Sequence, residues 1–189
     1  PQSVEVIGKG AFKGCKNLVI EVSEENERFV VIDGLLIDQE NKNAMLALHN
    51  AIHGDYVVPE CVCVIGENCF DGCEHISSLR IPGSVKEIGK SAFEGCKNLR
   101  SVEIEDGLIQ IGESAFEGCE SLIKIRIPDG VTEIGGRAFQ WCKSLTSISI
   151  PDGLKAIKSE TFYSCQSLYS IKIPSSVTLI GGNAFYGCN

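Results

Sequence analysis

The 189-residue sequence has little of what marks the commonest functional classes. It contains 17 Lys and Arg against 25 Asp and Glu, which gives a net charge of −8. A chain with this balance lacks the basic surface that attracts nucleic acid or an anionic membrane, so we expect neither as a partner. No apolar run approaches the roughly 18 residues that span a bilayer, and the first ten residues lack the charged and apolar segments of a signal peptide. We therefore expect no direct membrane insertion.

The motifs of common enzymes are also missing. The sequence has no G-x-S-x-G, no H-E-x-x-H and no Walker sequence. The segment from Gly8 to Gly14 resembles a glycine-rich phosphate loop only loosely, because its final glycine stands one position late. Acidic residues such as Glu94 and Glu117 recur at equivalent solvent positions, which is typical of a solvated face and not of a paired acid and base. We expect no enzymatic activity and no cofactor.

What the sequence does contain is a repeat of 23 residues. Phenylalanine recurs at this interval six times in succession, and cysteine follows each phenylalanine at the third position. A seventh pair, Phe12 and Cys15, precedes the series by 58 residues, which is one period plus 35. The six regular positions are Phe70, Phe93, Phe116, Phe139, Phe162 and Phe185. A period between 20 and 50 residues is typical of solenoids, propellers and arrays.

The pattern inside one unit selects among these architectures. Residues 127–149 show the consensus I-P-x-x-V-x-x-I-G-x-x-A-F-x-G-C-x-x-L-x-x-I-x most plainly. β-Branched residues at period two, as in Leu122-x-x-Ile125-x-Ile127, predict a strand with one buried face, and the proline ends it. The Ala-Phe-x-Gly-Cys segment is too short for a stable α-helix and predicts a 3₁₀ or single turn. Since a propeller blade needs four strands in about 40 residues, we predict a mainly β, right-handed leucine-rich-repeat solenoid with one parallel strand and a second short strand per coil.

The unit resembles the BspA-like class of leucine-rich repeats, whose hallmark is this I-P-x-x-V-x-x-I-G-x-x-A-F-x-x-C-x-x-L pattern. The resemblance implies a cell-surface or secreted protein of a host-associated microbe, in which the array serves adhesion and protein binding. Fold alone does not fix function. We expect a non-enzymatic module whose partner is a protein, with a host extracellular protein as a candidate. A structural stalk that spaces other domains is the alternative, and a metal-binding or enzymatic module is a remote third.

We expect a single solenoid domain over residues 1–189, with seven repeat cores and an insertion at residues 24–58. Asp33-Gly34 and the polar run at 39–43 are turn signals between strand-like stretches, so the insertion predicts a β-hairpin that replaces one coil. The chain begins in the proline column and ends in mid-repeat, without the polar caps that solenoids need. Further repeats or caps are therefore expected to flank this fragment. The oligomeric state stays open, with end-to-end packing as one option.

Ten cysteines in a secreted protein would ordinarily suggest disulfides, but seven of them form one column of the repeat. Equivalent residues on stacked coils lie about 5 Å apart with parallel Cα–Cβ bonds, whereas a disulfide requires Cβ atoms about 3.8 Å apart. We therefore predict a ladder of buried free thiols, with Cys69 also in the core. Cys61 and Cys63 are expected nearer the surface. Together with His49 and His53 they could form a tetrahedral zinc site, but the spacing matches no standard module, and we prefer two surface thiols with unrelated histidines.

Two columns of the repeat are predicted on the exposed face of the sheet. The first consists of Arg80, Glu103, Arg126, Ser149 and Lys172, and the second of Ser78, Ser101, Lys124, Ser147 and Ser170. Opposite charges on neighbouring strands attract by roughly 0.2–1 kcal/mol, so we expect Arg80, Glu103 and Arg126 to pair with one another. These columns either hold the sheet face together or form the surface on which a protein docks.

A second candidate surface lies near the end of the chain. The residue after each repeat phenylalanine changes from charged to aromatic, ending in Tyr163 and Tyr186, and Trp141 replaces the usual glycine before cysteine. Residues 140–189 carry a net charge of +2, whereas the preceding part of the chain carries −10. Because exposed Trp and Tyr are favoured at binding hot spots, Trp141, Tyr163 and Tyr186 are predicted to contact a ligand or a neighbouring domain. Ordinary surface variation is the alternative.

Overall fold

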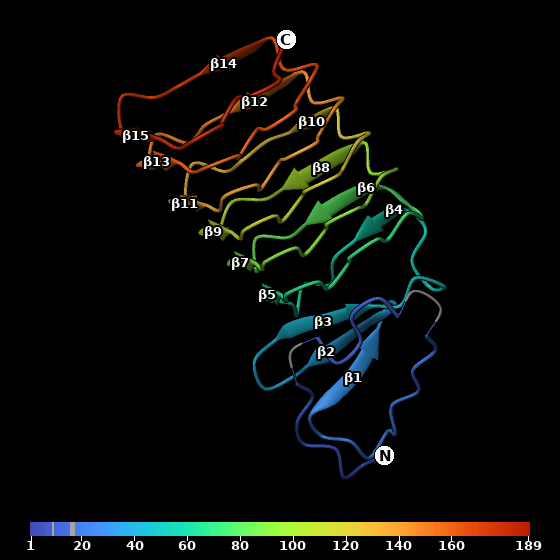
Figure 1. Ribbon diagram of the computed structural model, residues 1–189. Coiled ribbons are helices and arrows are strands. Elements are labelled where there is room, and N and C mark those ends of the chain that lie inside the picture. The colour runs from blue at the N-terminus through green and yellow to red at the C-terminus, as the bar shows by residue number, and fades with distance from the viewer. Residues whose placement is uncertain (9, 16–17) are drawn as a thin grey trace.

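The computed structural model describes residues 1–8, 10–15 and 18–189, which wind into a stack of β-coils (Figure 1). These residues form no α- or 3₁₀-helix, and none of them lies in a helix that could cross a membrane. The strands are β1 (Phe29–Ile32), β2 (Leu35–Asp38), β3 (Asn43–Ala47), β4 (Gly54–Val57), β5 (Val64–Ile65), β6 (Ile76–Ile81), β7 (Glu87–Ile88), β8 (Ser101–Ile104), β9 (Gln110–Ile111), β10 (Lys124–Ile125), β11 (Glu133–Ile134), β12 (Ser147–Ser149), β13 (Ala156–Ile157), β14 (Ser170–Lys172) and β15 (Leu179–Ile180).

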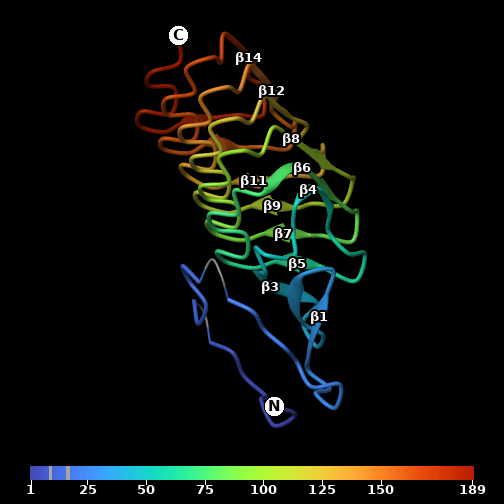
Figure 2. The same ribbon diagram turned by 90° about the vertical axis from the view of Figure 1, so that its right-hand side faces the viewer.

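Two sheets run along opposite sides of the stack (Figure 1), and Figure 2 views the stack from the side of β4, β6 and β8. Sheet A has the order β1-β2-β3-β5-β7-β9-β11, and sheet B has the order β14-β12-β10-β8-β6-β4. Residues 23 positions apart pair in parallel, so that Lys124 lies opposite Ser101 on one side and Ser147 on the other. The prediction of a parallel solenoid with a main strand and a short second strand per coil is confirmed. A separate pair, β13-β15, continues the side of sheet A beyond β11.

Phenylalanine and cysteine fill the space between the sheets. From Phe70 to Phe185 the rings stack, with neighbouring centroids 4.8–5.6 Å apart. Stacked aromatic pairs contribute about 0.5–1.5 kcal/mol beyond the burial of their area. The Cys96 thiol donates to the carbonyl of Phe70 at 3.2 Å, and the same contact recurs on each following coil. One column therefore supplies the packing and the next satisfies buried carbonyl groups.

The Ala-Phe-x-Gly-Cys segment forms consecutive single turns. Around Phe70, alternate N–H groups donate to the carbonyl three residues earlier and to the carbonyl 22 residues later, on the next coil. Because the bonds within the coil never occur on two consecutive residues, the turns do not merge into a 3₁₀-helix. Of the two predicted forms, the single turn is the one that occurs. The remaining N–H groups form hydrogen bonds between neighbouring coils.

Residues 24–58 form more than the predicted hairpin. Strands β1 and β2 are the hairpin, with Asp33 and Gly34 at φ 48° and 80° in its turn. Two positive φ angles in a two-residue loop are those of a type I′ turn. β3 adds an antiparallel third strand and then pairs in parallel with β5, which joins this meander to sheet A. β4 pairs with β6 and so begins sheet B.

The first repeat core does not join the phenylalanine ladder. Phe12 packs on the meander, in a cluster with Leu46 and Leu48, and Cys15 is exposed. Since the meander takes the place of a regular coil, the first coil has no equivalent coil on which to stack. The prediction of a buried thiol is therefore wrong at Cys15. The buried ladder consists of Cys73, Cys96, Cys119, Cys142 and Cys165, with Cys188 half-buried at its end.

Candidate binding surfaces

The outward face of sheet B forms a shallow groove of about 610 Å³ that extends from β4 to β12. Both predicted columns lie on this face in the predicted register, with Arg80 opposite Glu103 and Ser149 opposite Lys172. All five residues of the first column are exposed. Alternation along each strand places their neighbours in the core, so the fold presents these side chains in fixed rows.

The predicted pairing of Arg80, Glu103 and Arg126 with one another is wrong. Arg80 pairs with Glu105 at 2.5 Å, and Arg126 pairs with Asp106 at 3.5 Å. Both partners come after the strand and not from the facing position on it. Glu103 makes no ion pair in the described residues and acts on Arg80 only through a weaker, longer-range attraction.

Glu105 occupies the position at which the other regular coils have proline. One of its carboxylate oxygens accepts the N–H of Gly83 at 3.1 Å, and the other accepts Arg80. The Gly83 N–H and then Arg80 hold the pKa of Glu105 below its usual value. This anchoring fixes the carboxylate beside Arg80 and explains why Glu105, and not Glu103, is its partner. The interruption of the proline column was the signal in the sequence.

The face of sheet B divides by charge into two halves. The acidic half consists of the outward residues Asp55, Val57, Ser78, Arg80, Ser101 and Glu103, and the basic half of Lys124, Arg126, Ser147, Ser149, Ser170 and Lys172. In the acidic half, Asp55 is held by the hydroxyl of Ser78 at 2.6 Å. The basic half has three cations and no acid among its outward residues.

Two of the three predicted aromatic residues come together on the turn side of the last coils. The rings of Tyr163 and Tyr186 stack with centroids 5.0 Å apart. The backbone N–H of Trp141 donates to the carbonyl of Tyr163 at 2.8 Å, a bond that the equivalent glycines of earlier coils also make. Trp141 is 43% exposed and has φ 60°. A bulky residue in the left-handed region is uncommon and costs about 1–2 kcal/mol. Beside it, Gln140 is buried and its Oε1 has no hydrogen-bond partner in the described part of the chain.

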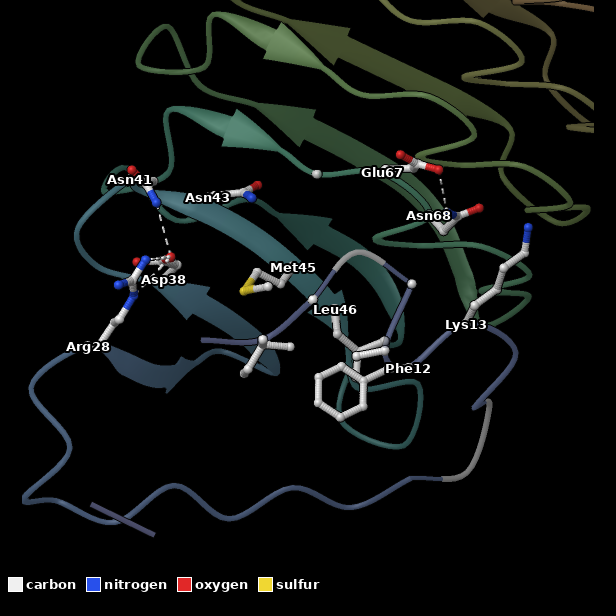
Figure 3. Close-up of a pocket in the computed structure, with 15 residues that line it drawn as sticks. Phe12, Lys13, Arg28, Asp38, Asn41, Asn43, Met45, Leu46, Glu67 and Asn68 are labelled. Atoms are coloured by element: carbon white, nitrogen blue, oxygen red, sulfur yellow. Dashed lines mark hydrogen bonds and ion pairs between the residues drawn. The ribbon is translucent and has the colours of Figure 1, made fainter. Parts of the chain in front are cut away.

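A second cavity, of about 270 Å³, lies between the first coil and sheet A (Figure 3). Asp38 in its wall is bonded to Arg28 at 3.1 Å and to the Asn41 side chain at 3.1 Å. Burial raises the pKa of the Asp38 carboxyl, but hydrogen bonds from Arg28, Asn41 and the backbone outweigh it and keep that pKa below its usual value. The charges of Arg28 and Asp38 in the wall thus satisfy each other.

Gly8 and residues 10–13 of the glycine-rich segment form part of the wall of this cavity. Lys9 of this segment lies outside the described residues. A phosphate loop requires a strand before it and a helix after it, and the described residues contain no helix. The cavity is therefore a packing boundary between the first coil and the meander, with Phe12 and Met45 as its apolar part.

Burial makes the ladder thiols poor nucleophiles. It raises the pKa of Cys73 and of Cys165 to about 12, with the neighbouring cysteine as a smaller cause. Since the thiolate is the reactive form, these side chains stay neutral near pH 7. Cys69 is buried as predicted, and Cys61 is exposed and Cys63 half-buried, also as predicted.

The four residues of the alternative zinc site lie in different environments. His49 is buried, whereas His53 is exposed and its ring makes an edge contact with His75, with centroids 5.3 Å apart. In residues 1–8, 10–15 and 18–189, no three His, Cys, Asp or Glu side chains are grouped closely enough to hold a metal ion. The geometry gives the zinc alternative no support.

Comparison with known proteins identifies the repeat. The family model for the BspA type leucine rich repeat region matches residues 63–189 in six copies, which is more than half of the chain. A leucine rich cell surface protein of Faecalibacterium prausnitzii is 30% identical, with a TM-score of 0.75 over 85% of this chain and 46% of that protein. The T. pallidum leucine rich repeat protein is 26% identical, with a TM-score of 0.61 over 89% of both chains.

A further structure shows the fold alone. The pneumococcal vaccine antigen PcpA is 21% identical, with a TM-score of 0.81 over 96% of this chain and 49% of that protein. The chain spans about half the length of the first solved structures it matches. A comparison with curated proteins found no match. The six repeat matches and the solenoid architecture together show that the chain belongs to the BspA-type leucine-rich repeat family.

Proposed function

We propose that this chain is a non-enzymatic protein-interaction or adhesion module of a bacterial surface or secreted protein, and that it binds its partner through the face of sheet B. The family supports an interaction module, because solenoids of this kind offer long rows of exposed side chains. The F. prausnitzii relative is described as a cell surface protein, which supports the location.

The observation that favours binding is that several charged side chains on this face make no ion pair within the described residues. If the rows served stability alone, opposite charges on neighbouring strands would pair with one another. Glu103, Lys124 and Lys172 are exposed, and none of them makes an ion pair in the described residues. Because these groups stand on a rigid scaffold, a partner would meet a preformed surface and lose little entropy in ordering it.

The cluster of Trp141, Tyr163 and Tyr186 is proposed as a second contact surface. The exposure of Trp141 and Tyr186, at 43% and 62%, supports this proposal, because exposed aromatic rings are favoured at binding hot spots. The competing function is a structural stalk, in which neither surface binds a partner.

Reversing the charges of the sheet face tests the main proposal. The variant Arg80→Glu, Glu103→Lys, Arg126→Glu keeps the fold, because all three side chains are exposed. Binding to purified serum and extracellular-matrix proteins is measured by surface plasmon resonance. We expect saturable binding of at least one of them by the unmodified chain and a loss of affinity of tenfold or more in the variant.

The matched control is Lys97→Glu, Glu113→Lys, Lys155→Glu, which makes the same charge changes at exposed positions away from sheet B. It should bind within twofold of the unmodified chain. Equal loss in both variants would show that net charge and not this face governs binding. Absence of saturable binding across the whole set of proteins would favour the stalk.

A further inference from the structure

The basic half of the sheet B face has unused cationic groups in a protein that is acidic overall. Lys124 and Lys172 are exposed and make no ion pair in the described part of the chain. Arg126 pairs only with Asp106, at 3.5 Å, and both side chains are mostly exposed. An exposed pair of this kind contributes little, so Arg126 can exchange Asp106 for an anion on a partner.

Hydroxyl groups lie between these cations. Ser147 stands beside Lys124, and Ser149 stands beside Lys172, in the parallel register of β10, β12 and β14. A hydroxyl donates to a carboxylate without adding charge or bulk. The outward residues of the basic half therefore present ammonium, guanidinium and hydroxyl donors, and no carboxylate, to whatever lies across it.

The spacing of the cations suits an extended chain that crosses the strands. Arg126 and Lys172 occupy equivalent positions on coils two apart, which places their backbones about 9.6 Å apart at 4.8 Å per strand. Three residues of an extended chain cover about 10 Å. In the extended polyproline II form, which has three residues per turn and rises about 3.1 Å per residue, residues i and i+3 lie on the same side of the chain. Carboxylates at these two positions would therefore reach Arg126 and Lys172 in turn, with Ser149 facing the residues between them.

Exposed apolar residues beside the cations favour a protein over a simple polyanion. Ile123, directly before Lys124, is 47% exposed, and Tyr169, directly before Ser170, is 77% exposed. They occupy the same column two coils apart. A polyanion without apolar groups gains little from covering Ile123, whereas an apolar side chain of a protein would gain by burying this surface. Tyr is also among the residues enriched at protein hot spots.

We infer that the basic half binds an acidic, extended segment of a partner protein, with carboxylates three residues apart against Arg126 and Lys172 and an apolar side chain against Ile123 or Tyr169. This inference rests on the proposed function of the sheet B face and specifies the chemistry of its partner.

Synthetic peptides and the intact chain provide the test. Fluorescence anisotropy is measured with a labelled 12-residue peptide that has Glu at every third position, one Leu, and Ser elsewhere. A second peptide of the same composition has its Glu residues consecutive. We expect the spaced peptide to bind at least fivefold more tightly than the second, and to weaken at least fivefold between 50 and 300 mM NaCl, because exposed charge pairs are screened.

The variant Lys124→Glu, Lys172→Glu should lose at least tenfold in affinity for the spaced peptide. Lys97→Glu, Lys155→Glu changes the same charge at exposed positions off this face and should stay within twofold. Absence of peptide binding, equal affinity for both peptides or an unaffected Lys124 and Lys172 variant would overturn the inference. So would tighter binding of heparin or single-stranded DNA than of the spaced peptide, since that would identify a general polyanion surface.

The two proposals fail in distinguishable ways. A protein that binds the unmodified chain, loses affinity in the Arg80, Glu103 and Arg126 variant, and is unaffected by the Lys124 and Lys172 variant would support the proposed function and reject the acidic segment. Binding of the spaced peptide without binding of any protein in the set would support recognition of an acidic segment. It would also show that the set of serum and extracellular-matrix proteins was the wrong choice of partners.

Discussion

Each coil has glycine at two positions of the repeat, and these positions form two columns along the stack. Other residues replace glycine at a few places in both columns, and the structural consequences differ between the columns. The sheet-side column, next to sheet A, consists of Gly66, Gly89, Gly112, Gly135 and Gly181, with Lys158 as its exception. The turn-side column, before cysteine, consists of Gly14, Gly72, Gly95, Gly118 and Gly187, with Trp141 and Ser164 as its exceptions. The first kind of exception interrupts a sheet, and the second does not.

The sheet-side glycines are required for space. A Cβ added at Gly112 would lie 2.6 Å from the backbone of Gly89, and one added at Gly135 would lie 2.3 Å from the N atom of Glu113. Neither residue has a positive φ. The constraint is therefore the close approach of successive coils, which only a residue without Cβ allows.

Lys158 stands where this approach would occur between β11 and β13. Sheet A ends at β11, and β13 pairs only with β15. The Gly135 N–H donates to Ile111 at 2.8 Å, but no equivalent bond joins Lys158 to Ile134 in the described residues. The Cβ of Lys158 accounts for this break. The gap is spanned by an ion pair between Lys158 and Glu133 at 2.6 Å.

The turn-side glycines are required for conformation. Gly95 has φ 69°, and a Cβ added there would meet its nearest neighbour at an ordinary 3.7 Å. Trp141 and Ser164 adopt the same backbone, with φ 60° and 57°. Their N–H groups still donate to the next coil, at 2.8 and 2.7 Å. A side chain in this column costs strain but does not separate the coils.

The largest effect is expected from placing a side chain in the intact sheet-side column. Gly135→Lys should destabilise the chain by about 3 kcal/mol, because the added Cβ overlaps backbone and the ladder between β9 and β11 must open. Urea unfolding measures the change. Gly153→Lys is the control, since a Cβ there meets neighbours at 3.6 Å or more. A loss below 1 kcal/mol at Gly135 would mean that coil spacing adapts and that Lys158 does not explain the break.

An intermediate effect is expected from restoring glycine at the exception. Lys158→Gly should allow residues 155 and 158 to donate to Thr132 and Ile134, as their counterparts do on the preceding coils. Two added backbone bonds contribute about 1 kcal/mol each, from which the flexibility of glycine in the unfolded chain subtracts about 0.5–1 kcal/mol. The lost ion pair with Glu133 subtracts up to about 1 kcal/mol more. The net gain is therefore at most about 1 kcal/mol, and amide exchange at residue 158 should slow at least tenfold.

Lys158→Ala separates the two roles of this side chain. It removes the ion pair with Glu133, which is exposed and worth less than about 1 kcal/mol, but it keeps the Cβ. Amide exchange at residue 158 should therefore stay as fast as in the unmodified chain. Slow exchange in the alanine variant would show that the ion pair, and not the Cβ, holds the coils apart.

Most of the fold could be predicted because each column of the repeat has one physical role. The 23-residue period fixed the parallel register, and alternation within each strand fixed which residues face outward. Lys158 was visible as an exception, but its effect depends on the distance between coils, which no pattern within one coil contains. The exposure of Cys15 likewise depends on which element stacks beside the first coil, and a meander of three strands occupies that place.

The sequence predicts which residues lie on the candidate surface but not which ion pairs they form. The columns that contain Arg80 and Lys172 lie on sheet B as predicted. The pairing rule considers only residues that face each other on neighbouring strands, whereas Arg80 reaches beyond the strand to Glu105. A long side chain selects its partner from all carboxylates within reach, and the Gly83 N–H has already fixed the position of this one.

The smallest effects are expected in the turn-side column. Ser164→Gly should stabilise the chain by about 0.5–1 kcal/mol, because glycine adopts φ 57° without strain. Trp141→Gly relieves the same strain but gives up the contacts of a half-exposed indole, so its stability should change by less than about 0.5 kcal/mol. Urea unfolding of both variants measures the difference.

A binding measurement distinguishes the roles of Trp141 and Ser164. If Trp141 is retained for contact with a partner, Trp141→Gly should weaken the binding of a verified protein partner at least fivefold while Ser164→Gly leaves it unchanged. A loss of stability above 1 kcal/mol in Trp141→Gly, with binding unaltered, would instead assign the indole to packing. The Ser164 variant is the matched reference, because it removes a side chain from the same column, with the same backbone, on the next coil. Strain alone is common to both residues, so only the exposed ring can account for a difference between them.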